Sequence, residues 1–221
     1  DTFSSRAGIT ARNELLELSK VAIVGLGGTG AYLLDLLAKT PIANLHLYDG
    51  DTFSTHNAFR APGAASVDDL NARMAKVDYY AAMYASMRRN IYPHAVYVTA
   101  ATVSELGDAD FVFLAMDSGP DKWAIVNALI AAGVPFIDTG IGVSDDDNGI
   151  AGQVRVTTGL PGATDHVTHG GLISVVAGDA AEYDTNLQVA ELNMAAAVMA
   201  VIRFKKWLQF YADAEGELHS T

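Results

Sequence analysis

A glycine loop, two aspartates and two cations follow one another along the chain at spacings that suit phosphate chemistry. The loop, Gly25-Leu-Gly-Gly-Thr-Gly30, has the pattern G-x-G-x-x-G, with glycines at Gly25, Gly27, Gly28 and Gly30. Glycines in such a loop allow a tight turn and let a phosphate approach the N-terminus of the next helix, where backbone amides and the helix dipole favour an anion. The loop therefore predicts a nucleotide site.

An acidic pair follows the loop at a distance that suits ribose recognition. Asp49 lies 19 residues after Gly30, at the end of the second predicted strand, and Asp51 comes two residues later. A carboxylate in this position accepts hydrogen bonds from ribose hydroxyls. An NAD(P)-dependent oxidoreductase would carry the same loop and the same aspartate, so these residues alone leave an NAD site and an ATP site open.

Four other residues, which come later in the chain, favour a triphosphate as the ligand. Asn57 and Arg60 lie in the loop after the second predicted strand, and Lys76 lies in a helical stretch. Arginine offers a planar fork of donors to phosphate oxygens, and the lysine adds a second cation. Asp117 follows a later strand and leaves a carboxylate free for Mg²⁺. Together these residues indicate an ATP·Mg²⁺ site.

Alternating strand and helix patterns predict the elements that position these residues. Short apolar runs indicate strands at 21–25, 44–48, 95–98, 111–115 and 135–138. Helical spacing occurs at 9–20, 31–39, 67–89 and 121–132. This repeated alternation implies an α/β fold, with a doubly wound, mostly parallel, Rossmann-like sheet and helices on both of its faces.

The last third of the chain departs from this alternation. Asn148-Gly149 is typical of a tight turn, and the alternating residues 152–157 indicate a strand outside the regular order. Residues 185–211 form an Ala- and Met-rich helical stretch, which we expect to be buried on most sides, against the sheet or against a second subunit. The predicted sheet therefore carries a C-terminal strand and helix extension.

Length and composition exclude several classes of protein. The 221 residues, half of them hydrophobic, suit a single domain over residues 1–221, although a chain that begins with Asp1 can be a piece of a longer protein. A net charge of −12 argues against nucleic acid or an anionic membrane surface as a partner. No signal peptide opens the sequence and no apolar run reaches the ~20 residues that span a bilayer, so we expect a cytoplasmic protein.

The ordered set of residues resembles the adenylation domain of the ThiF, MoeB and ubiquitin-activating enzyme family. The resemblance covers nearly the whole chain, and its motifs are the glycine loop, Asp49-x-Asp51, Asn57-x-x-Arg60, Lys76-Val77-Asp78 and Asp117. It implies a Rossmann-like domain that binds ATP·Mg²⁺ and adenylates the C-terminal carboxylate of a ubiquitin-like or sulfur-carrier protein. Asp49 would hold the ribose and Asp117 the Mg²⁺, and the phosphates would be held by Asn57, Arg60 and Lys76.

The resemblance also implies a homodimer in which an arginine of one subunit reaches the site of the other. Ser5-Arg6 looks like the N-terminal segment that supplies this arginine, and Arg12 is the alternative. With Arg6, the residues implied in catalysis are Arg60, Lys76 and Asp117. No general base is required, because a carboxylate is already ionised at neutral pH.

The absence of cysteine separates this chain from many members of that family. Many relatives hold a structural zinc with two Cys-x-x-Cys pairs, and ubiquitin-activating enzymes form a thioester on a catalytic cysteine. Here the adenylate would pass to an external sulfur or amine nucleophile, or to a cysteine outside this chain. A non-catalytic partner or adaptor subunit is a further alternative, against which the retained Arg60, Lys76 and Asp117 argue.

Overall fold

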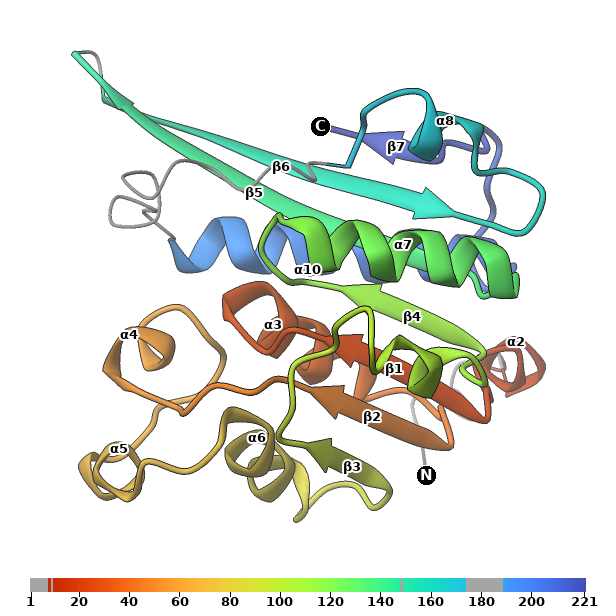
Figure 1. Cartoon of the computed structure of the whole chain (residues 1–221). Helices are drawn as coiled ribbons and strands as arrows, with labels where there is room; N and C mark the ends of the chain where they lie inside the picture. The colour runs from red at the N-terminus through yellow and green to blue at the C-terminus, as the bar shows by residue number, and fades with distance from the viewer. Residues whose placement is uncertain (1–7, 9, 148, 174–188) are drawn as a thin grey trace.

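In the part of the chain that the computed structural model describes, residues 8, 10–147, 149–173 and 189–221, seven strands form one sheet (Figure 1). Its order is β3-β2-β1-β4-β5-β6-β7. The first five strands in this order pair in parallel, and the β5–β6 and β6–β7 pairs are antiparallel. The strands are β1 Lys20–Val24, β2 Asn44–Tyr48, β3 Ile91–His94, β4 Phe111–Leu114, β5 Phe136–Asp146, β6 Gly149–Gly159 and β7 His219–Ser220.

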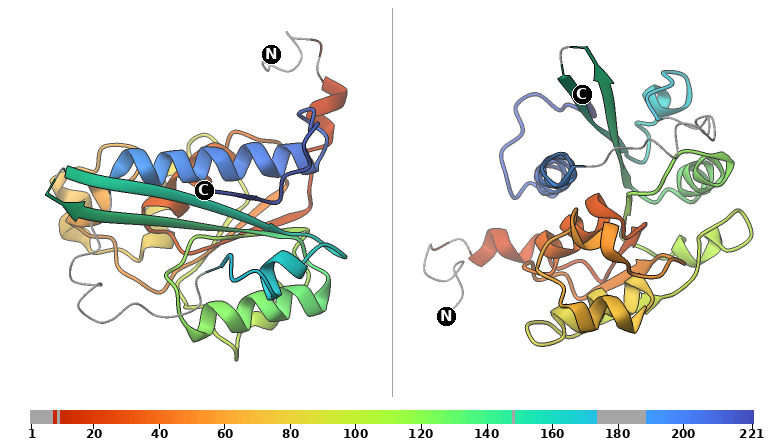
Figure 2. Two further views of the ribbon diagram at one scale, coloured as in Figure 1. Left: turned by 90° about the horizontal axis from the view of Figure 1, so that it is seen from above. Right: turned by 90° about the vertical axis from the view of Figure 1, so that its left-hand side faces the viewer.

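Helices cover both faces of this sheet, which confirms the predicted doubly wound α/β fold. They are α2 Thr10–Glu14, α3 Gly28–Leu37, α4 Thr55–Ala58, α5 Val67–Ala72, α6 Lys76–Tyr84, the 3₁₀ helix Val103–Leu106, α7 Pro120–Ala132, α8 Asp165–Thr168 and α10 Ala190–Trp207. Side chains of α3, α6 and α10 form the hydrophobic core on one face, and those of α7 and the 3₁₀ helix form the core on the other. Figure 2 shows α7 and α10 on opposite sides of the sheet.

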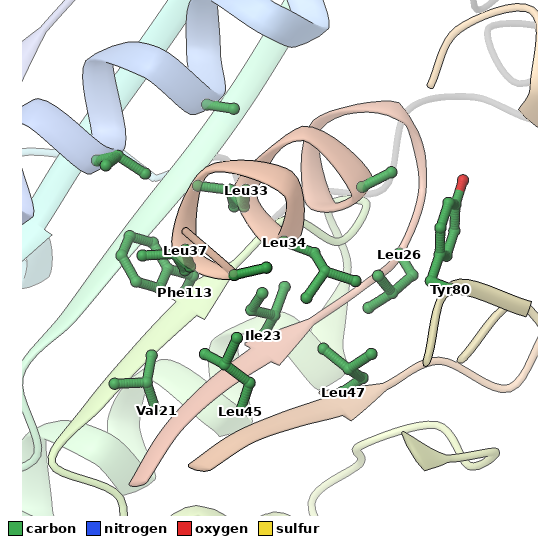
Figure 3. Packing of buried hydrophobic residues seen from close by; sticks show 14 of the residues in the cluster. Val21, Ile23, Leu26, Leu33, Leu34, Leu37, Leu45, Leu47, Tyr80 and Phe113 are labelled. Atoms are coloured by element: carbon green, nitrogen blue, oxygen red, sulfur yellow. The ribbon is translucent and has the colours of Figure 1, made fainter. Parts of the chain in front are cut away.

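Strand β1 illustrates why the sheet is buried on both faces. Val21 and Ile23 belong to the core under α3 and α10, and Ala22 and Val24 belong to the core under α7. Successive side chains of a strand point to opposite faces, so a continuous apolar run suits a central strand between two helical layers. Figure 3 shows the first core, in which side chains of the strands meet three leucines of α3: Leu33, Leu34 and Leu37.

Strands β5 and β6 continue beyond the parallel sheet as a long hairpin (Figure 1). The register of β4 with β5 ends at Asp138, whereas β5 pairs with β6 as far as Asp146. The strand predicted at 152–157 is part of β6, and the predicted C-terminal helix is α10, which contacts α3 and both strands of the hairpin. Although α10 is the longest described helix, neither it nor any other described helix is long and apolar enough to cross a membrane. Asn148 and 185–188 lie outside the described residues.

Two predicted helices are interrupted. The helix expected at 9–20 ends as α2 at Glu14, and turns lead from there to Lys20, which already belongs to β1. The helix expected at 67–89 is divided into α5 and α6 by Arg73, whose φ of +48° is left-handed. Backbone bonds tether the following residues to the segment after β2, because the amide of Phe53 donates to the carbonyl of Met74 at 2.8 Å. This tertiary pairing outweighs the helical spacing.

The strand predicted at 95–98 is wrong, since the third strand along the chain is β3, Ile91–His94, which pairs in parallel with β2. Strand β3 lies at the edge of the sheet, where Pro93 is tolerated because no further strand needs its missing amide. Residues 95–98 leave the sheet, and Tyr97 and Val98 line the cavity described below. The short strand β7 was not expected from the sequence.

Candidate functional site

A cavity of about 890 Å³ opens at the carboxyl ends of β1, β2 and β4. From β1 the chain continues through β2 and β3 on one side and then crosses to β4 on the other, so the strand order reverses at this point. Ligands of open α/β sheets bind in the crevice that such a reversal creates. The cavity is therefore the candidate functional site.

The glycine loop forms the floor of this cavity. The structural reason for having glycine differs from one of its positions to the next. Gly25 has a φ of +91°, and a Cβ there would lie 2.5 Å from the carbonyl oxygen of Ala115. A Cβ on Gly30 would overlap the carbonyl oxygen of Gly25. Gly27 lines the cavity, and a Cβ there would have no atom within 4 Å. Gly27 is also the N-cap of α3, which no described side chain caps, so the first amides of the helix are accessible to an anion.

Asn193 of α10 supports the loop from behind. Its Oδ1 accepts a hydrogen bond from the Thr29 hydroxyl at 2.9 Å, and its Nδ2 donates to the carbonyl of Val189 at 3.0 Å. Any side chain on Gly28 would collide with the Asn193 amide. The sequence analysis missed Asn193 because 164 residues separate it from Thr29 and no local pattern marks it.

The predicted acidic pair and Lys76 form a single charged group in the cavity wall. The Nζ of Lys76 lies 2.6 Å from Asp51 Oδ2 and 3.5 Å from Asp49 Oδ2. Asp49 also accepts hydrogen bonds from the amide of Leu26 at 2.6 Å and from that of Asp51 at 2.8 Å. Although burial raises the pKa of Asp51, hydrogen bonds from Lys76 and Tyr97 outweigh it and hold that pKa below its usual value. The Asp51 carboxylate is therefore ionised at neutral pH, and the contacts of both carboxylates fix their orientation.

The break between α5 and α6 positions Lys76. Ala75 forms a β-bridge with Thr52, and the amide of Lys76 donates to the carbonyl of Asp51 at 2.9 Å. Lys76 is therefore the first residue of α6 and is buried beside the acidic pair, instead of lying within a long helix as its sequence context suggested.

Arg60 and Asp117 line the same cavity from the segments that follow α4 and β4. Burial lowers the pKa of the Arg60 guanidinium, and the carboxylate of Asp117 is close enough to oppose this shift. The Nε of Arg60 is buried and has no hydrogen-bond partner among the described residues. A charged donor in this state suits an anionic ligand.

Asn57 is not among the described residues that line the cavity, and His56 takes that position. The Oδ1 of Asn57 accepts hydrogen bonds from the amide and the hydroxyl of Ser54, which closes a capping box at the start of α4. Its Nδ2 is buried without a partner among the described residues. Burial, followed by the charges of Arg60 and Lys76, lowers the pKa of His56, so this ring is neutral at neutral pH.

Three charged residues at the β5 end of the cavity were missed by the sequence analysis. Lys122 and Arg155 line the cavity and flank Asp138, which is fully buried. Lys122 Nζ lies 2.6 Å from Asp138 Oδ1, and Arg155 Nη2 lies 2.9 Å from Asp138 Oδ2. The three side chains of this group together carry one net positive charge. The one available signal was Asp138 at the end of a predicted strand, the same situation as Asp49.

The structure brings most of the predicted site residues to one cavity. Those that line it are Gly25, Gly27, Gly28, Asp49, Asp51, Arg60, Lys76 and Asp117. Arg6 lies outside the described residues, and the alternative Arg12 donates to the carbonyl of Gln209 instead. No cluster of three or more potential metal ligands exists in the described ranges. A triphosphate-bound Mg²⁺ needs only one or two protein carboxylates, and the exposed Asp117 is suited to this role.

Comparison with known proteins identifies a family for this chain and solved structures with a similar fold. The model of the ThiF family matches residues 5–215. A search of curated proteins found no match.

Several solved structures share the fold. PaaA is 20% identical, with a TM-score of 0.69 over 92% of this chain and 69% of PaaA. Escherichia coli MccB with MccA-N7isoAsn is 17% identical, with a TM-score of 0.68 over 96% of this chain and 66% of MccB. E. coli TcdA, a tRNA N6-threonylcarbamoyladenosine dehydratase, is 16% identical, with a TM-score of 0.66 over 93% and 92%. Identities this low establish the fold alone, and the chain spans only 59% to 69% of the PaaA and MccB chains.

Proposed function

The chain belongs to the ThiF family, and we propose that it binds ATP with Mg²⁺ and transfers AMP to the C-terminal carboxylate of a peptide or protein. The observation that carries the proposal is the convergence of five chemically distinct features on one cavity. These features are the uncapped amides of α3 at Gly27 and the side chains of Asp49, Lys76, Arg60 and Asp117. MccB, which has the same fold, has also been solved with ATP, and this supports the choice of nucleotide.

The geometry supports one orientation of the nucleotide. Asp49 retains lone pairs beyond its two amide bonds and would accept the ribose hydroxyls at the end of β2. The triphosphate would then extend across the glycine loop towards the unpartnered Nε of Arg60. Lys76 would bind phosphate with its third N–H while Asp51 and Asp49 hold the ammonium in place.

The described residues fit a magnesium ion delivered with the nucleotide. Asp49 and Asp51 are engaged by Lys76, whereas Asp117 is exposed and next to the phosphate-binding Arg60. Asp117 would hold the Mg²⁺, which would neutralise charge that develops on the leaving pyrophosphate.

The reaction is an in-line displacement that needs positioning and charge neutralisation. A carboxylate oxygen of the substrate bonds to the α-phosphorus, the bond from that phosphorus to the bridging oxygen of the β-phosphate breaks, and pyrophosphate leaves. Arg155, which lines the cavity and is the more exposed of the two cations on Asp138, would attract the incoming carboxylate. No residue of the chain has to remove a proton, because the nucleophile is already an anion.

For the substrate we propose a ubiquitin-like or sulfur-carrier protein, activated by a homodimer in which Arg6 reaches the partner's site. The acidic chain, with a net charge of −12, disfavours an RNA substrate such as the one in TcdA's name, and the MccB complexes with MccA make a peptide carboxyl group the closer parallel. Residues 1–221 contain no cysteine and form no thioester, so the acyl-adenylate would pass to an external nucleophile or to a cysteine outside this sequence.

The test is substrate-dependent release of pyrophosphate. The protein is incubated with ATP, Mg²⁺ and hydroxylamine, together with peptides that end in Gly-Gly carboxylate or, as the matched control, in Gly-Gly amide. We expect pyrophosphate, AMP and a peptide hydroxamate with the carboxylate peptides only. Intact-mass spectrometry without hydroxylamine should detect a substrate heavier by one AMP.

Two results would overturn the proposal in favour of the alternatives. Tight NAD binding without ATP binding would favour an oxidoreductase. ATP binding without AMP transfer to any carboxylate would favour a non-catalytic partner subunit.

A further inference from the structure

One exposed aromatic ring borders the cavity beside Asp49. Tyr48 and Val98 line the same wall, but both are buried, and the Tyr48 ring is stacked on His94. Tyr97 also lines the cavity and is 61% exposed. Among the described residues of this wall, Tyr97 thus offers the cavity the accessible π surface.

Tyr97 is held in place although it is exposed. Its hydroxyl donates a hydrogen bond to Asp51 Oδ1, and burial together with the charges of Asp51 and Asp49 adds to this bond in raising the Tyr97 pKa to about 12. The ring lies against the backbone of Gly50, where an added Cβ would come within 2.6 Å of the ring carbon Cε2. Gly50 therefore leaves space for the ring, and Asp51 fixes its orientation.

We propose that the ring of Tyr97 is the platform on which the purine base of the bound nucleotide stacks. The inference rests on the proposed function, because it requires a nucleotide whose ribose is held by Asp49. Asp49 and Gly50 are adjacent in the chain, so a base attached to that ribose lies within reach of the ring on Gly50.

The physical basis is that stacking rewards a rigid aromatic surface. Every base has a π face, and an aromatic side chain gains binding energy from it without hydrogen bonds to the base edge. A ring already oriented by Asp51 and Gly50 loses little freedom on binding. The platform should therefore bind adenine and guanine alike, and discrimination between them has to come from elsewhere in the wall.

A simpler explanation is that Tyr97 only orients Asp51 and, through it, Lys76. The two explanations differ in which part of the ligand depends on Tyr97 for its binding. A platform affects ligands that contain a base, whereas an orienting hydroxyl affects phosphate binding through Lys76.

The experiment compares calorimetric binding of ATP, GTP, adenosine and inorganic tripolyphosphate to four variants and the wild type. Tyr97→Ala removes the ring, and Tyr97→Phe removes only the hydroxyl. Gly50→Ala keeps the tyrosine but displaces its ring, and serves if Tyr97→Ala fails to fold. Tyr92→Ala is the matched control, because Tyr92 is an exposed aromatic residue of β3 that does not line the cavity.

We expect Tyr97→Ala and Gly50→Ala to weaken the binding of adenosine, ATP and GTP by about tenfold or more and to leave the binding of tripolyphosphate unchanged. Tyr97→Phe should retain most of the affinity, and Tyr92→Ala all of it. The inference is overturned if Tyr97→Phe loses as much as Tyr97→Ala, or if tripolyphosphate weakens in parallel with ATP. Wild-type protein that binds neither ATP nor tripolyphosphate would instead refute the proposed function.

Discussion

The ammonium of Lys122 lies 2.6 Å from the carboxylate of Asp138, and both side chains are almost completely buried, at 2% and 0% exposure. Arg155 contacts the other oxygen of the same carboxylate at 2.9 Å. Charges removed from water are tolerated only when each has a partner, so the stability of this region depends on Asp138.

We predict that Asp138→Asn lowers the free energy of unfolding by about 3–5 kcal/mol, because it leaves two cations without their counter-charge. Urea unfolding measures the effect. The matched control is Asp108→Asn, which removes the 75% exposed partner of Lys20 and should cost less than about 1 kcal/mol. Equal losses in the two variants would show that the buried cluster is not stabilised by its charge.

Lys76→Gln should weaken ATP binding by about ten- to a hundredfold, because a hydrogen bond from a charged donor to a phosphate is lost. Adenosine lacks phosphates, so its affinity should not change. Binding of both ligands is measured by calorimetry, with Lys39→Gln, on the exposed pair with Asp35, as the control. A parallel loss of adenosine affinity would point to a structural effect through Asp49.

Asp117→Asn should remove the part of ATP affinity that depends on Mg²⁺, since the amide keeps the shape of the carboxylate but not its charge. The measurement compares ATP binding in Mg²⁺ with binding in EDTA. Asp121→Asn, at another acidic residue of the cavity lining, is the matched control and should preserve the difference. If Asp117→Asn behaves like the wild type in both solutions, the ion is held elsewhere.

Mixing Arg6→Ala with Arg60→Ala should restore part of the activity that each variant lacks alone. In a mixed dimer one site receives Arg6 from the other subunit and has its own Arg60. Pyrophosphate release by the mixture, compared with each parent, measures the recovery. Verified mixed dimers that stay inactive would contradict a contribution of Arg6 across the interface.

The stability of the protein should fall as the pH drops from about 6.5 towards about 4. Burial, followed by the charges of Lys20 and His94, lowers the pKa of His46 from 6.5 to about 4. Between these values the unfolded chain binds a proton at His46 that the folded chain does not, so acid favours unfolding.

Urea midpoints at several pH values in this window test the effect. In His46→Gln the dependence on pH should be shallower than in the wild type, and in His169→Gln, at an exposed histidine, it should match the wild type. An unchanged slope in His46→Gln would assign the acid sensitivity to other groups.

Local sequence patterns predicted those site residues that are positioned by the strand or turn in which they lie. Gly25 and Asp49 follow directly from strand ends, and their places at the carboxyl edge of the sheet follow from parallel pairing. Lys76 was correctly predicted in a helix, but it begins α6 instead of lying within one continuous helix over residues 67–89. The reason is that the bridge between Thr52 and Ala75 is a tertiary contact that no helical period encodes.

Residues that act on the site from distant elements could not be predicted. Lys122 and Arg155 become neighbours only when β6 pairs with β5 and α7 covers the sheet. Tyr97 lay in a segment predicted as a strand, because its short apolar run suits a strand as well as it suits a cavity wall. Asn193 carries no local sign of its contact with the glycine loop.

The contact between Thr29 and Asn193 also concerns the order of events during synthesis. It joins positions 164 residues apart, and closing so long a loop costs entropy that a single hydrogen bond does not offset, so further contacts between α10 and α3 are needed. A growing chain acquires the strand and turn of the loop early, but the loop lacks its support until α10 has left the ribosome and docked on α3. A chain that ends before Asn193 would keep the residues of the glycine loop but lack the side chain that supports the loop from behind.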